Sequence, residues 1–207
     1  GTVGFLGTGS LYRRLALNRA GLVKGMRVLD VACGTGAVTR EMLNIVGDPT
    51  LVWGADPTPG MLDVAHKGLE AQFVQGRAEE LPFEKGAFDF LSMGYALRHV
   101  TDLTVAFREY HRVLRPGGKL LLLEITRPER AWVRFLAWVY FGIALPPLSF
   151  LITGSRDASE MMSYYWETID ACVPPKTILD ALEQSGFKQI HRGVELGIFS
   201  AYRAVRE

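Results

Sequence analysis

The sequence has few cysteines and almost no net charge. Its 207 residues include only Cys33 and Cys172, which are too few for a disulfide framework and lie far from any histidine cluster with zinc-ligand spacing. Lysine and arginine number 23 against 22 aspartates and glutamates, so the net charge of +1 gives no electrostatic reason to expect a nucleic-acid partner. The two cysteines favour a reducing, cytoplasmic location without a metal centre.

Targeting and membrane-spanning signals are also scarce. No basic region followed by an apolar stretch opens the chain, so no signal peptide is expected. Residues 135–152 carry no charge, and these eighteen residues are long enough for a membrane-spanning helix. Pro146 and Pro147, however, interrupt the segment. Because lipid leaves broken backbone hydrogen bonds unsatisfied, we expect a buried or membrane-facing lid here and not a span.

What the sequence does contain is a regular alternation of strands and helices. With 48% hydrophobic residues and no repeat or linker, the chain 1–207 is expected to form a single domain. The alternation predicts a mostly parallel sheet with helices on both faces. The expected strands are 26–31, 51–55, 72–75, 88–93 and 119–125, and the expected helices are 11–23, 38–46, 61–69, 103–114 and 176–184. Two closing strands, 187–191 and 195–204, predict an antiparallel hairpin at the sheet edge.

Residues 131–170 interrupt this rhythm. They are rich in aromatic residues and methionine and show no strand pattern, which predicts an inserted helical substrate cap. Large apolar surfaces of this kind contact a ligand, a membrane or a partner, and burial against the sheet is the alternative. Three arginines lie beside the aromatic residues and are suited to hold the segment on an anionic membrane surface. They are Arg127, Arg130 and Arg134.

A glycine turn follows the first expected strand. The sequence VLDVACGTG, from Val28, places Gly34, Thr35 and Gly36 between a strand and a helix. Glycine allows a ligand to approach the backbone closely, and the new helix offers free N–H groups. A tight connection without a ligand is the alternative, and such a tripeptide alone is weak evidence. The strand–turn–helix context favours a ligand site.

A carboxylate follows at a spacing that suits a nucleotide. Asp56 stands twenty residues beyond Gly36, at the end of the second expected strand, where a carboxylate accepts hydrogen bonds from a ribose diol. The turn and this acid predict an adenosine-containing cofactor, either a dinucleotide or S-adenosylmethionine. Two details favour the latter, because Asp30 suits a cationic amino group and Thr39 replaces the third glycine of the dinucleotide fingerprint.

Several longer stretches resemble one enzyme family. They are VLDVACGTGAVT (from Val28), GADPTPGML (from Gly54), GRAEELPFEKGAFDF (from Gly76), GYALRHVTD (from Gly94), RVLRPGGKLLLLE (from Arg112) and YYWETI (from Tyr164). From about Leu11 to its C-terminus the chain is similar to the ubiquinone and menaquinone biosynthesis C-methyltransferases, which are class I S-adenosylmethionine-dependent enzymes. The resemblance implies a Rossmann-like α/β fold with a seven-stranded sheet and the cofactor at the carboxyl ends of the first two strands.

The resemblance also implies cofactor contacts, residue by residue. Gly34, Thr35 and Gly36 would cradle the amino-acid end of S-adenosylmethionine. Asp56 would hold the ribose, and Met61 would pack on the adenine.

The chain departs from the family pattern at three positions. Arg77 and Ala78 stand at the adenine edge, where the family usually has Asp or Asn followed by Ala. Because arginine cannot accept a hydrogen bond from the adenine amino group, we expect Arg77 to stack on the ring, to turn to solvent, or to leave the role to Glu79. Gly94 and His99 replace the usual Ser and Asn, which bears on the substrate more than on the cofactor.

Carbon methylation of a hydroxylated ring requires a base, or a cation that stabilises a phenolate, in a site shielded from water. Arg98 and His99, just past the fourth expected strand, are the candidates, and a loop salt bridge and a surface position are the alternatives. We expect C-methylation of a hydrophobic hydroxyaromatic or quinol-like substrate. O- or N-methylation of another hydrophobic small molecule and a non-catalytic scaffold remain alternatives.

Overall fold

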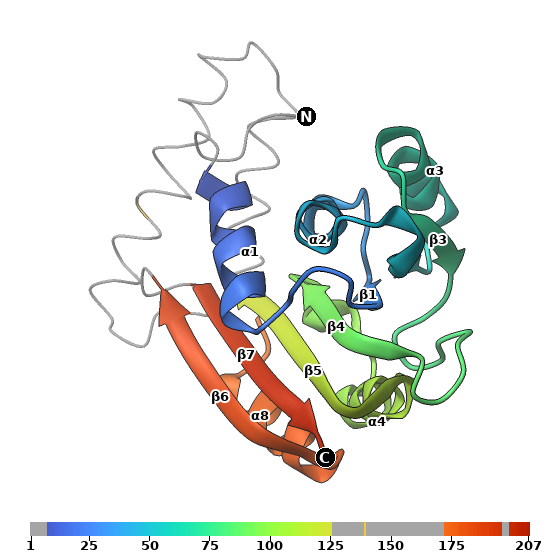
Figure 1. Ribbon diagram of the computed structural model, residues 1–207. Coiled ribbons are helices and arrows are strands. Elements are labelled where there is room, and N and C mark those ends of the chain that lie inside the picture. Colours follow the sequence, from blue (N-terminus) through green and yellow to red (C-terminus); the bar gives the residue numbers. More distant parts are fainter. Residues whose placement is uncertain (1–7, 126–138, 140–171, 196–198) are drawn as a thin grey trace.

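The computed structural model describes residues 8–125, 139, 172–195 and 199–207. These form one seven-stranded sheet with the strand order β3-β2-β1-β4-β5-β7-β6 (Figure 1). The strands are β1 (Val28–Val31), β2 (Val52–Asp56), β3 (Gln72–Gln75), β4 (Phe88–Gly94), β5 (Leu114–Ile125), β6 (Phe187–Glu195) and β7 (Phe199–Arg206). The expected cap, 131–170, lies outside the described residues except for position 139 and stays a prediction.

The sheet is mostly parallel, as the alternating pattern predicts. Strands β1 to β5 pair in parallel, whereas β7 runs antiparallel to both β5 and β6. The two closing strands therefore form the expected antiparallel pair at one edge. β1 lies between β2 and β4, so the strand order reverses beside β1, which is where open α/β sheets bind their ligands.

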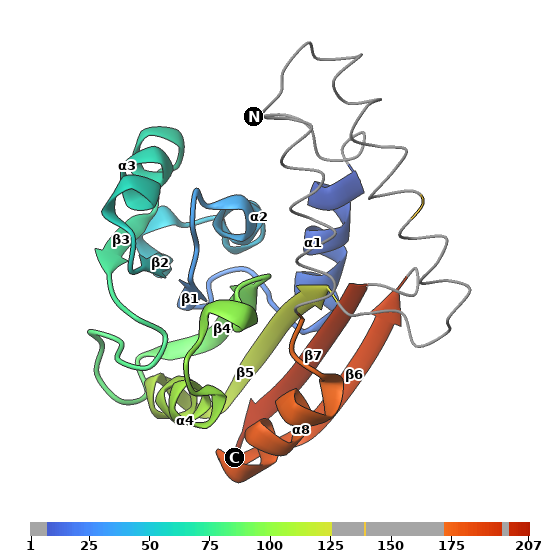
Figure 2. The same ribbon diagram turned by 180° about the vertical axis from the view of Figure 1, so that it is seen from behind.

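Helices cover both faces of the sheet (Figures 1 and 2). They are α1 (Thr8–Arg19), α2 (Ala37–Val46), α3 (Pro59–Gly68), α4 (Leu103–Val113) and α8 (Pro175–Gln184). α1 and α2 pack on one face and share a buried cluster with Leu121 and Leu123 of β5, whereas α4 and α8 pack on the other face against Leu120 and Leu122. The run of four leucines is thus explained by a strand that is buried on both sides.

Several boundaries differ from the expected ones. The first helix ends at Arg19 and not at residue 23, because Gly21 takes a left-handed conformation with φ 82°. β5 begins at Leu114, which pairs with Phe88, so the Pro-Gly-Gly sequence after Arg115 is an irregularity within the strand and not only a helix stop. Within the described ranges, no helix combines the length and the apolar character needed to cross a bilayer.

Candidate active site

The carboxyl ends of three neighbouring strands meet at one edge of the sheet. Val31, the last residue of β1, is level with Ala55 of β2 on one side and Met93 of β4 on the other. The residues that follow these positions therefore stand side by side. Asp56 and Gly94, both predicted to bind the cofactor, are among them, so they share this edge.

The glycine turn needs glycine at position 36. Gly36 is the N-cap of α2 and has φ 84°, a conformation that is strained for residues with a Cβ. A Cβ on Gly36 would also collide with the Leu69 side chain. Gly36 itself provides no side-chain cap, and a Cβ on Gly34 would meet only open space, so a ligand can approach the backbone at the start of α2. These features suit the carboxylate of an amino acid.

Asp56 binds the same turn directly. Its carboxylate is buried, and its two oxygens accept hydrogen bonds from the backbone N–H groups of Gly34 and Thr58, each at 2.9 Å. Because each carboxylate oxygen accepts more than one hydrogen bond, Asp56 retains acceptor capacity for ribose hydroxyls. The glycine turn and the expected ribose acid are therefore held as one unit.

Asp30 lies beneath the turn in a closed polar cluster. Its side chain points between the sheet and α2, where it accepts hydrogen bonds from Thr39 Oγ1 at 2.6 Å and from Ser92 Oγ at 2.7 Å. The residue is 1% exposed, and this burial raises the pKa of its carboxyl to about 6. Both oxygens thus already have partners, and contact between Asp30 and the cofactor's amino group stays a prediction.

The adenine-edge residues follow β3. The side chain of Arg77 is 68% exposed, and its Nε lies 3.8 Å from Glu79 Oε2. Glu79 uses its other oxygen to accept the N–H of Thr101 at 3.0 Å. Arg77 therefore turns to solvent, one of its three expected placements, while Glu79 ties this segment to the loop before α4. Met61 is 45% exposed in the first turn of α3, and its packing on adenine stays a prediction.

Arg98 and His99 lie in a short 3₁₀ helix, η3 (Leu97–His99), directly after β4. Arg98 donates to the Tyr95 carbonyl at 2.6 Å, and its charge acts on the buried carboxyl of Glu124, whose pKa is raised by burial. His99 is largely exposed. The part of its side chain that is buried and, second, the neighbouring Arg98 charge lower its pKa below the ordinary value of 6.5. The imidazole is therefore neutral, and able to accept a proton, at neutral pH.

Two residues at this edge were not singled out from the sequence. Ala32 and Tyr95 have φ of 52° and 60°, and they follow the neighbouring strands β1 and β4. Non-glycine residues rarely adopt such angles, which cost about 1 to 3 kcal/mol each and cluster at functional sites. Neither residue type signals a positive φ, so only the structure could reveal them. The backbone of Tyr95 is held by its N–H bond to the Leu123 carbonyl at 2.7 Å.

Solved structures share this fold. A S-adenosylmethionine-dependent methyltransferase from Aquifex aeolicus superposes with a TM-score of 0.71 and 18% identity, covering 98% of this chain and 94% of that one. Haemonchus contortus phosphoethanolamine N-methyltransferase 2, solved with S-adenosyl-L-methionine, gives 0.67 and 17%, covering 95% and 52%. These likenesses show that the chain has the Rossmann-like α/β fold of class I methyltransferases.

Sequence comparisons narrow this class. The model of the ubiE/COQ5 methyltransferase family matches residues 3–206. The ubiquinone/menaquinone biosynthesis C-methyltransferase UbiE of Shewanella halifaxensis is 36% identical over 188 residues, covering 87% of this chain and 74% of that protein. Its namesake from Hahella chejuensis is 37% identical with the same coverage. The chain belongs to the ubiE/COQ5 methyltransferase family. It is an S-adenosylmethionine-dependent methyltransferase, which confirms the expected fold class, activity and cofactor.

Proposed function

We propose that this methyltransferase transfers the methyl group to a ring carbon of a hydrophobic hydroxyaromatic or quinol-like substrate. The observation that carries the proposal is the position of Arg98 and His99, which follow β4 at the same sheet edge as the glycine turn. The names of the relatives, which are C-methyltransferases of ubiquinone and menaquinone biosynthesis, support it.

S-adenosylmethionine supplies an electrophilic methyl group on a sulfonium, and the protein supplies the binding and the proton transfer. The α2 N-terminus would hold the amino-acid carboxylate of the cofactor and Asp56 would hold its ribose, with Gly34 leaving the backbone open to it. Neutral His99 would take the phenolic proton of the substrate, and Arg98 would stabilise the phenolate. The activated ring carbon would form the new C–C bond as the S–CH3 bond of the sulfonium breaks and leaves a neutral thioether. Loss of the ring C–H proton to water would then restore the aromatic phenolate, which would take back the proton held by His99.

The methylated atom separates this proposal from its alternative. Arg77, Gly94 and His99 depart from the family pattern, and these departures favour O- or N-methylation of a different hydrophobic molecule as the second candidate. Incubation with methyl-labelled S-adenosylmethionine and a demethylated prenyl quinol tests both, because carbon NMR distinguishes a ring-bound methyl from a methoxy or N-methyl group. A ring-bound label supports the proposal, and a labelled oxygen or nitrogen contradicts it.

A substrate of this kind resides in a bilayer, so we also propose cytoplasmic, peripheral contact with a membrane. In the described part of the chain, α1 exposes Leu11 (58%) and Leu15 (40%), one turn apart, beside Arg14, which is partly exposed and pairs through its Nε with Glu41 at 3.0 Å. This combination suits a helix that lies on an anionic surface. Co-sedimentation with vesicles that contain anionic lipid tests the contact, and Leu11→Ser with Leu15→Ser should abolish it. Equal binding of the variant would contradict it.

A further inference from the structure

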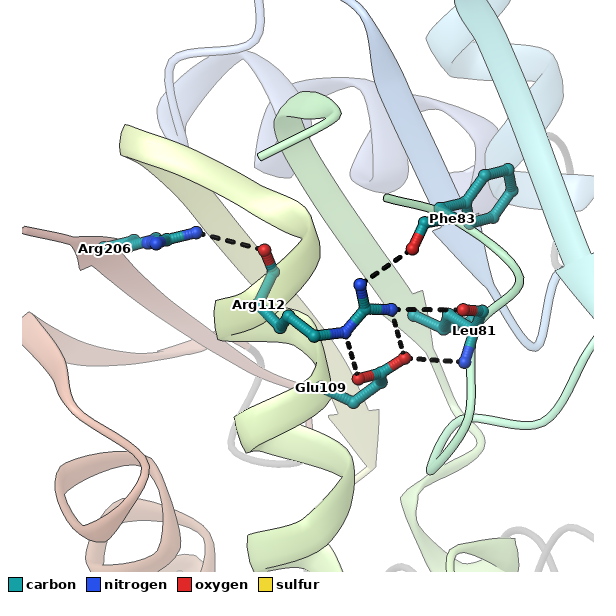
Figure 3. Close-up of polar contacts among 5 residues, drawn as sticks. All are labelled: Leu81, Phe83, Glu109, Arg112 and Arg206. Carbon is teal, nitrogen blue, oxygen red and sulfur yellow. Dashed lines mark hydrogen bonds and ion pairs between the residues drawn. The ribbon is translucent and has the colours of Figure 1, made fainter. Parts of the chain in front are cut away.

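An ion pair at the end of α4 has a geometry suited to a structural clamp. Arg112 binds Glu109 through two atoms: its Nε lies 2.7 Å from Oε2 and its Nη2 lies 2.6 Å from Oε1 (Figure 3). The Glu109 side chain is only 14% exposed. Parallel contacts of this kind set the direction of the guanidinium plane as well as its position.

The same pair holds the backbone of a neighbouring loop. Arg112 donates to the carbonyl of Phe83 at 2.8 Å and to that of Leu81 at 3.1 Å, and Glu109 accepts the N–H of Leu81 at 2.8 Å (Figure 3). Three main-chain groups of the loop are thus satisfied by two side chains of α4. A lysine at position 112 would be unable to make these contacts together, because it lacks the planar fork.

This loop begins with the adenine-edge residues. Its first residue, Gly76, donates its N–H to the carbonyl of Asp56 at 3.2 Å, and the turn after it is closed by the bond from the Glu80 N–H to the Arg77 carbonyl. A Cβ on Gly76 would lie only 2.9 Å from Pro82 Cδ, so the two ends of the loop touch. Residues 76–83 are therefore anchored at one end to the ribose acid and at the other end to α4.

We propose that the Arg112–Glu109 pair is a positioning device for adenine recognition. By fixing Leu81 and Phe83, it holds the 76–83 loop so that the main chain of Ala78 meets the adenine edge. This inference rests on the proposed placement of the cofactor. It assigns a role in binding to two residues that lie apart from the cofactor edge, near the C-terminal end of a helix.

The test compares Arg112→Gln with Arg115→Gln. Arg115 is a matched control, because it forms an ion pair of similar length, 2.7 Å from Nε to Asp89 Oδ1, which ties β5 to β4 and does not contact the 76–83 loop. The ligands are S-adenosylhomocysteine and its inosine analogue, which presents a carbonyl oxygen in place of the adenine amino group. Calorimetry gives both dissociation constants at a temperature where circular dichroism shows each variant to be folded.

We expect the wild type to prefer the adenine ligand. Arg112→Gln should weaken binding of the adenine ligand about tenfold or more, because the site is then held less firmly. It should also bring the ratio of the two dissociation constants closer to one. Arg115→Gln should keep both values within about twofold. The inference is overturned if Arg112→Gln preserves the preference, even with weaker binding of both ligands, or if Arg115→Gln loses it equally. A wild type that binds both ligands equally overturns it too, whereas one that binds neither contradicts the proposed function itself.

Discussion

Val38 and Gly94 approach so closely that position 94 has no room for a side chain. A Cβ on Gly94 would lie 2.9 Å from Val38 Cγ2, closer than such atoms approach in proteins. Val38 is on the first turn of α2 and Gly94 ends β4, so the contact joins the glycine turn to the strand that precedes Arg98 and His99. Position 94, where the family pattern has serine, is thus glycine in a chain whose facing helix carries the branched residue Val38.

Gly94→Ser is expected to lower the free energy of unfolding by about 1 to 3 kcal/mol, because it overpacks a close contact. Val38→Ala creates space at the same point, so the double variant Gly94→Ser with Val38→Ala should be more stable than the sum of the two single changes predicts. Urea unfolding of the four proteins measures this coupling. Additive effects would show that the contact with Val38 is not the reason for glycine at position 94.

Asp56→Ala should weaken S-adenosylhomocysteine binding by about 1 to 3 kcal/mol, since it removes a charged acceptor and leaves the Gly34 N–H without its partner. Calorimetry measures the dissociation constant. Asp48→Ala is the matched control, because Asp48 also accepts a backbone N–H at 2.9 Å, from Thr50, at an exposed position in a different loop. Equal affinities of wild type and Asp56→Ala would remove Asp56 from the cofactor site.

The pH dependence of turnover should report His99. Its pKa is lowered by partial burial and by Arg98, so the neutral base persists below pH 6.5 and activity should fall only at lower pH. Arg98→Gln removes the neighbouring positive charge, so the pKa of His99 should rise and the loss of activity at acid pH, the acid limb of the profile, should move to higher pH. Turnover should be lower and cofactor affinity nearly unchanged. In His111→Gln, a histidine change on α4, the limb should stay in place. A limb that Arg98→Gln leaves unmoved would exclude His99 as the base.

Asp30 should make stability depend on pH. Its carboxyl has a pKa of about 6 in the folded protein against an ordinary 3.8, so ionisation is disfavoured in the folded state. This group's favourable contribution is complete below about pH 4 and is lost as the pH rises through 6, a change of about 3 kcal/mol. Asp30→Asn carries no charge, so its stability relative to wild type should increase across this interval. Chemical unfolding at several pH values measures the difference, and a constant difference would argue against a raised pKa of the Asp30 carboxyl.

Sequence patterns predicted the sheet well because its strands and helices alternate strongly. The leucine run of β5 and the glycines after β1 both mark elements that a parallel sheet requires. The closing pair was predicted less accurately. β6 extends to Glu195, past a bulge where Gln189 has φ 50°, and a glutamine gives no sign of such a bend.

The site could be located from the sequence but not oriented. Asp56 and the glycine turn follow from the spacing, and both lie where expected. The direction of Asp30 did not follow, because a strand buried on both faces has no polar alternation that shows which way a residue points. The role of Glu79 toward Thr101 was equally hidden, since it depends on two loops that are distant in sequence. The Arg112 clamp joins residues of α4 to main-chain groups, which carry no sequence signal at all.

The bulge in β6 also bears on how copies of this protein behave in solution. Among the strands that the structure describes, β6 and β3 are the two edges of the sheet, and an open edge is a template on which a second chain can add a strand. At the β6 edge, the kink at Gln189 and the exposed Lys188 beside it interrupt the row of backbone groups with which a second chain could pair. On the other side β3 offers only four residues, with Gln72 and Gln75 exposed. Both edges thus resist the strand-to-strand association that leads to aggregation.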